Sequence, residues 1–229
     1  MIGIYDYTVV LTYMSLVSAI GGITLAVART PHPILASFCL LFCGLCDMFD
    51  GKIARTKKNR TEEEKAFGIQ IDSLCDIVAF GVQPAVLAIA LCGYRWYAYL
   101  VGSLFVLAGL IRLAYFNVTE EQRQKETEEV RKNYTGLPIT ASALIFPLFY
   151  SIVSVYCLCT EEITRFGRLF MQGNFRALLC VLMALTGILY ITPFKMRKPR
   201  SRELWLILAV GLLVAAVLLL THLRRLGVF

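Results

Sequence analysis

The chain has 229 residues, of which 58% are hydrophobic and only 17% are charged, and its formal net charge is +7. Its mean hydropathy is +0.66, whereas a typical soluble domain carries about a quarter charged residues. This composition argues against an ordinary water-soluble domain and favours one integral membrane domain.

The apolar residues fall into seven long segments that are separated by polar connections. In chain order, these segments cover residues 7–28, 33–49, 67–92, 96–117, 137–159, 173–194 and 203–222. Runs of this kind predict membrane-spanning helices, so we expect an all-α, polytopic membrane protein. We assign residues 1–194 to a six-helix membrane domain. Residues 195–229 then form a basic connection and an extra C-terminal hydrophobic segment.

The basic residues predict which ends of the helices face the cytoplasm. If the N-terminus is cytoplasmic and all seven segments cross, the inner connections 50–66, 112–134 and 195–202 contain 16 of the 23 Lys and Arg residues. The positive-inside rule favours this orientation. We therefore expect a multi-pass protein of the cell membrane, with the connection between its second and third segments at the cytoplasmic face.

Four aspartates flank that connection. Asp47 and Asp50 are three residues apart, and Asp72 and Asp76 are four apart, so each pair shares one helix face. Carboxylates at the edge of a low-dielectric region repel one another and are costly to desolvate. Divalent cations offset this cost, and oxygen ligands suit hard ions such as Mg²⁺ or Mn²⁺. Helix capping or pairing with nearby lysines would explain one aspartate, but the spacing of all four favours a metal site.

The neighbouring residues indicate a phosphate ligand. Gly51 allows close approach to the backbone, Arg55 can bind phosphate oxygens with a planar fork, and Gly68 leaves room one turn before Asp72. Two metal ions, an arginine and two glycines together indicate a pyrophosphate site, because phosphoryl transfer depends on positioning and charge neutralisation.

The pattern Asp47-x2-Asp50-Gly51-x2-Ala54-Arg55…Gly68-x3-Asp72-x3-Asp76 resembles the signature of the CDP-alcohol phosphatidyltransferases. Twelve residues separate Arg55 from Gly68, which is four more than the family pattern has. The resemblance implies a membrane enzyme with a helical bundle that transfers a phosphatidyl group from CDP-diacylglycerol to an alcohol and releases CMP.

The resemblance also implies roles for individual residues. Asp47 and Asp72 would bridge two divalent cations, Mg²⁺ or Mn²⁺. Asp50 and Asp76 would each complete one metal site, and Asp76 would also be the general base. Contacts with CDP-diacylglycerol would come from five residues: Gly51, Arg55, Gly68, Ser15 and Thr61.

Three further stretches, "IDSLCDIVAFGVQPA" (71–85), "RLAYFNV" (112–118) and "TGLPITA" (135–141), resemble the phosphatidylserine synthase branch of this family. This branch implies L-serine as the acceptor, with Arg112 binding its carboxylate; Tyr115 replaces a second arginine of the motif. The resemblance further implies a homodimer among membrane lipids. We expect no nucleic-acid partner.

Two alternatives stay open. Another acceptor, such as glycerol 3-phosphate or an inositol phosphate, would keep the reaction class but would call for a cluster of basic side chains. A cation transporter would place charges near mid-span in several helices. Every aspartate except Asp6 lies between residues 47 and 76, which favours an enzyme.

Overall fold

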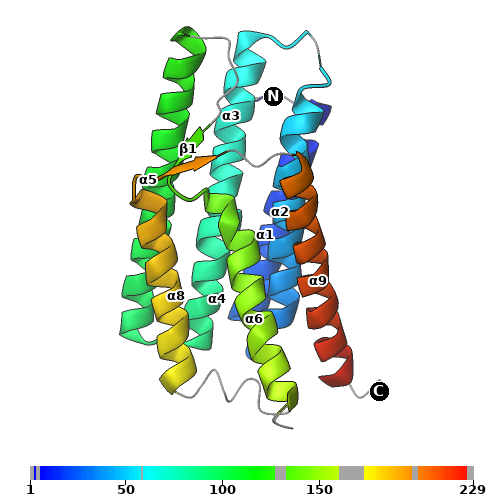
Figure 1. Ribbon diagram of the computed structural model, residues 1–229, viewed down its shortest axis with the longest axis vertical. Helices are drawn as coiled ribbons and strands as arrows, with labels where there is room; N and C mark the ends of the chain where they lie inside the picture. The colour runs from blue at the N-terminus through cyan, green and yellow to red at the C-terminus, as the bar shows by residue number, and fades with distance from the viewer. Residues whose placement is uncertain are drawn as a thin grey trace.

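The protein is a bundle of long helices, seen here in a computed structural model that describes Gly3 and residues 6–57, 59–126, 133–159, 173–197 and 201–225 (Figure 1). The α-helices are α1 (Val10–Val27), α2 (Pro33–Ala54), α3 (Glu62–Asp76), α4 (Gln83–Leu91), α5 (Trp96–Glu126), α6 (Ser142–Cys159), α8 (Gly173–Ile191) and α9 (Ser201–Arg225). Short elements complete the list: 3-10 turns η1 (Tyr7–Val9) and η3 (Ile139–Ala141), π-helix η2 (Ile77–Val82), and strands β1 (Asn133–Thr135) and β2 (Lys195–Arg197).

Within the described residues, seven helical segments are long and apolar enough to cross a membrane. The prediction of an all-α, multi-pass membrane protein is therefore confirmed. Several helices are longer than their apolar cores: α2 continues to Ala54, and α3 starts at Glu62. A capping box between Thr61 and Glu64 starts α3 in the polar connection, because it satisfies backbone N–H groups that the first turn leaves free.

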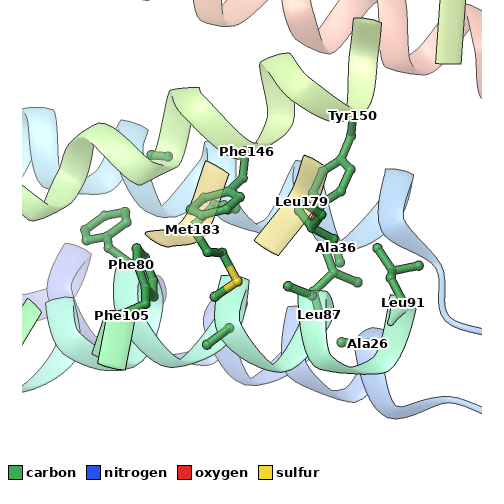
Figure 2. Close-up of a cluster of buried hydrophobic side chains, with 14 of the residues drawn as sticks. Ala26, Ala36, Phe80, Leu87, Leu91, Phe105, Phe146, Tyr150, Leu179 and Met183 are labelled. Carbon is green, nitrogen blue, oxygen red and sulfur yellow. The ribbon is translucent and has the colours of Figure 1, made fainter. Parts of the chain in front are cut away.

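The core of the bundle is built from apolar side chains of several helices (Figure 2). Phe105 of α5 packs edge-on against Phe146 of α6, with ring centroids 5.6 Å apart, and lies 5.5 Å from the ring of Tyr190 in α8. Many large apolar side chains instead point outward, such as Val17 at 73% exposure. An apolar exterior around a packed core suits a protein surrounded by lipid.

The third membrane-spanning segment is one continuous helical rod, but its middle section, η2, is a π-helix. Pro84 explains the departure, because proline has no N–H and its ring crowds the carbonyl four residues earlier. That carbonyl belongs to Phe80, and the buried hydroxyl of Ser142 donates a hydrogen bond to it at 2.9 Å. The π-helix begins immediately after Asp76, as such segments frequently do at functional sites.

Strands β1 and β2 form a small antiparallel clip that joins the connection before α6 to the one after α8. Gly136, which follows β1, has a φ of +76°, and a Cβ there would lie 3.0 Å from the carbonyl oxygen of Thr192. Its N–H donates to Phe194, and the N–H of Leu137 donates to Leu189 at the end of α8. The segment that follows β1 thus satisfies one carbonyl, that of Leu189, which the last turn of α8 leaves free. These two strands were not predicted.

Ser142→Ala should destabilise the bundle by about 1–3 kcal/mol, because the buried Phe80 carbonyl would lose a hydrogen-bond donor. The matched control is Ser154→Ala on the same helix, whose buried hydroxyl has no hydrogen-bond partner among the described residues. Thermal unfolding of both variants in detergent measures the difference. Equal melting temperatures for the two variants would contradict this account of the π-helix.

Candidate active site

The four aspartates lie on two consecutive membrane-spanning segments, two of them near the end of α2 and two where α3 continues into η2. Asp47 and Asp50 belong to the last turns of α2, and Asp72 and Asp76 belong to the last turns of α3. The end of α2 and the start of α3 lie at the same end of the bundle, at the top of Figure 1. Asp72 interacts electrostatically with Asp47 and Asp50, and Asp76 interacts with all three others. The fold therefore gathers the two pairs into one acidic cluster.

The cluster is partly withdrawn from solvent. Asp76 is 9% exposed, and the other three aspartates are half-buried. None of the four makes an ion pair with a basic side chain in the described ranges. Carboxylates in such a position are costly unless a cation accompanies them, and an all-oxygen donor set suits Mg²⁺ or Mn²⁺.

The cluster fits divalent cations by its donor chemistry and its charge, although its side chains are not arranged as a closed ligand cage. In the part of the chain that the structure describes, no three His, Cys, Asp or Glu side chains form a ready-made metal site. The assignment of individual aspartates to metal ions therefore stays a prediction.

The two glycines of the signature differ in how much space lies beside them. A Cβ at Gly51 would meet nothing within 4 Å, so the backbone next to Asp50 is open to a ligand. A Cβ at Gly68 would lie 2.6 Å from Nη2 of Arg60. Arg55, at the C-terminal cap of α2, is exposed.

Sequence analysis missed Arg60, which reaches Gly68 from the connection between α2 and α3. Its Nη2 donates to the carbonyl of Glu64 at 3.1 Å. The sequence could have indicated this contact, because a long arginine side chain eight residues before a helical glycine can reach the space that the missing Cβ leaves. Thr61, the predicted nucleotide contact, is the N-cap of α3, where its hydroxyl accepts from the N–H of Glu64 at 3.1 Å.

Ser15 and Arg112 lie in buried positions that bind protein groups. Ser15 is 5% exposed in α1, and its carbonyl accepts a hydrogen bond from the thiol of Cys43, one turn before Asp47. Arg112 is 6% exposed, and its Nε donates to the carbonyl of Leu137 at 3.0 Å. Arg112 thereby connects α5 to the segment that follows the clip, and binding of a ligand by either residue stays a prediction.

A second link between α3 and α5 lies beside Asp72. The amide of Asn117 donates to the hydroxyl of Ser73 at 2.9 Å. Ser73 follows Asp72 directly, so this bond fixes the rotation of α3 where its carboxylates face the cluster. The pair of residues was quoted within the resembling motifs, but their contact was not predicted.

Comparison with known proteins places these features in one family. The family model for CDP-alcohol phosphatidyltransferase matches residues 8–188, which include every predicted site residue. No solved structure matches the chain.

Curated relatives carry related names. The chain is 34% identical over 151 residues to the CDP-diacylglycerol–serine O-phosphatidyltransferase of Saccharomyces cerevisiae, covering 64% of this chain but only 53% of that protein. It is 28% identical over 209 residues to the protein of the same name from Helicobacter pylori, covering 90% and 78%. It is 39% identical over 116 residues to the archaetidylserine synthase of Methanothermobacter thermautotrophicus, covering 50% and 46%. The chain thus spans about half the length of the yeast and archaeal relatives.

An ion-pair network ties the N-terminal segment to the outer edge of the site. Nζ of Lys57 lies 2.9 Å from Oδ2 of Asp6 and 2.9 Å from Oε1 of Glu64. The hydroxyl groups of Tyr7 and Thr56 are 3.2 Å apart. The hydrogen bond from Lys57 lowers the pKa of Asp6, and the bonds to Asp6 and Glu64 raise the pKa of Lys57. The network therefore holds the segment next to η1 against the connection that carries Arg55.

Lys57→Gln should release residues 6–9 from this connection, and hydrogen exchange of the Val9 amide should become faster. The contribution of Asp6 is present above its unfolded pKa of about 3.9 and is lost as the pH falls through its lowered folded pKa. The contribution of Lys57 is present below about 10.4 and is lost as the pH rises through its raised folded pKa. Exchange protection should therefore stay level between about pH 5 and 9. The control is Lys65→Gln, which breaks the local ion pair with Glu62.

Proposed function

Because the chain belongs to the CDP-alcohol phosphatidyltransferase family, we propose that it transfers the phosphatidyl group of CDP-diacylglycerol to the hydroxyl of L-serine, giving phosphatidylserine and CMP. The observation that carries the proposal is the cluster of four carboxylates where α2 and α3 adjoin, in a chain whose curated relatives are named for this reaction. Such a cluster has no use in packing the bundle, because unpaired buried charge destabilises a fold.

In this proposal the aspartates hold two divalent cations, Mg²⁺ or Mn²⁺. Asp47 and Asp72 would contribute to both metal sites, Asp50 would complete one and Asp76 would complete the other. The bound cations would neutralise the diphosphate and acidify the acceptor hydroxyl. The open backbone at Gly51 and the exposed guanidinium of Arg55 would bind the phosphates of the nucleotide.

Asp76 is the proposed general base. It is the least exposed of the four aspartates, which supports a position at the inner end of the site, away from bulk water. Asp76 would remove the proton from the serine hydroxyl, and the serine oxygen would attack the phosphorus that carries diacylglycerol. The bond from that phosphorus to the CMP oxygen would break, and CMP would leave with its charge held by Arg55. Exclusion of water would limit hydrolysis of the lipid substrate.

The acceptor rests on the names of the relatives and on Arg112. Arg112 would bind the serine carboxylate while its Nε stays bonded to Leu137, so the clip would fix the position of the charge. A homodimer, surrounding membrane lipids and a cytoplasmic site in the cell membrane complete the proposal. The excess of Lys and Arg in the connections 50–66, 112–134 and 195–202 supports the cytoplasmic placement.

The proposal predicts CMP release by the purified protein from CDP-diacylglycerol and L-serine, in the presence of Mg²⁺ or Mn²⁺ and not of a chelator. Asp76→Asn should lower kcat by about 10²–10⁴-fold, as expected for loss of a general base. Glu62→Gln, which removes an exposed carboxylate from the same helix, should leave kcat unchanged.

The acceptor is tested by replacing serine with glycerol 3-phosphate, inositol, an inositol phosphate or no acceptor. Release with one of these and not with serine would keep the reaction class and overturn the serine assignment. An absence of release with every acceptor, from protein with a cooperative melting transition, would overturn the proposed activity and favour cation transport.

A further inference from the structure

We propose that Arg60 is a second phosphate-binding arginine, which binds the diphosphate of the cytidine nucleotide together with Arg55. The inference rests on the function proposed above and adds to it a residue from the part of the connection that is longer than the family pattern. Three observations carry it: the position of the guanidinium, its incomplete hydrogen bonding and the charge of the site.

The guanidinium of Arg60 lies on the face of α3 that bears the aspartates. Gly68, Asp72 and Asp76 follow one another at intervals of four residues, so they line a single helix face. Nη2 of Arg60 occupies the space beside Gly68, where a Cβ would approach it to 2.6 Å. Arg60 is therefore one helical turn from Asp72, at the end of the cluster nearer the connection.

Arg60 retains unused hydrogen-bonding capacity at this position. Nη2 donates to the carbonyl of Glu64, but Nε is buried and has no hydrogen-bond partner among the described residues. Arg60 also forms no ion pair with an acidic side chain in the described part of the chain. A buried donor without an acceptor is uncommon and calls for an explanation, and phosphate oxygens are the acceptors that match a guanidinium fork.

A purely structural role explains only part of this arrangement. The bond to Glu64 would brace the first turn of α3, yet the capping box of Thr61 and Glu64 already does so. A lysine could make the same single bond with less crowding at Gly68. Neither role accounts for a buried Nε that faces no protein acceptor.

The charge of the site leaves room for a second arginine. Two divalent cations would neutralise the four aspartates, and the diphosphate of CDP-diacylglycerol would add two negative charges. Arg55 offsets one of these charges, and Arg60 offsets the other. Arg55 is the C-cap of α2, the helix that carries Asp47 and Asp50, and the guanidinium of Arg60 lies beside Gly68 of α3, the helix that carries Asp72 and Asp76.

The test is equilibrium binding of CDP, CMP and cytidine to the full-length protein in detergent, in the presence of Mg²⁺, by calorimetry. Arg60→Ala should weaken CDP binding about 10- to 100-fold, as expected for a hydrogen bond between charged groups, and should leave cytidine binding unchanged. Arg60→Lys should recover part of the loss, because it restores the charge without the fork. In turnover, Arg60→Ala should raise the KM for CDP-diacylglycerol while the KM for serine stays constant.

Lys65→Ala is the control, because it removes a positive charge from the first turn of α3, five residues after Arg60, and among the described residues Lys65 forms an ion pair with Glu62 alone. The inference would be overturned if Arg60→Ala and the wild-type protein had equal CDP affinities and equal melting temperatures. The proposed function would then remain intact. An equal loss in Lys65→Ala would show general electrostatic attraction and would overturn it too. If the unchanged protein binds no CDP and releases no CMP, the proposed function and this inference both fail.

Discussion

The structure depends on holding four carboxylates together at the margin of a low-dielectric region. Their mutual repulsion and desolvation oppose folding, so the surrounding helices must fix α2 and α3 without relying on those side chains. The contacts that do so lie next to the aspartates: Asn117 bonds to Ser73, and the thiol of Cys43 bonds to α1 one turn before Asp47. Because these neighbouring contacts stabilise the helices, the aspartates need not pair with basic side chains and remain available to a ligand.

The π-helix that directly follows Asp76 also helps to fix the aspartate-bearing helix. A proline within a spanning helix frees a carbonyl, and in lipid that carbonyl must be satisfied within the protein. Ser142 of α6 donates to it, which joins η2, directly after Asp76, to α6. Arg112 makes a comparable connection from α5 to Leu137. The bond from Ser142 thus ties α6 to the membrane-spanning segment that carries Asp72 and Asp76, and the bond from Arg112 ties α5 to the segment that leads into α6.

Sequence analysis predicted what depends on periodicity and composition, and it missed what depends on single long-range contacts. The seven spans follow from runs of apolar residues, and the spacing of the aspartates places each pair on one helix face. The clip could not be predicted, because each strand has three residues and Asn133 is paired with Arg197 far along the chain. Sequence analysis divided the chain after residue 194, and this division separates Lys195 from its strand partner Thr135. The contact of Arg60 with Gly68 was missed because it depends on the path of the connection between α2 and α3.

The clip also bears on how the protein is made. Thr135 has no strand partner until Lys195 has been synthesised, and Gly136 likewise requires the carbonyl of Phe194. During synthesis the ribosome must therefore add α6 and α8 before either strand can close. The aspartate-bearing helices can enter the bilayer early, whereas the connection bound by Arg112 acquires its final backbone bonds late. A chain interrupted after α6 would already contain every carboxylate of the cluster and would still lack the clip beside it.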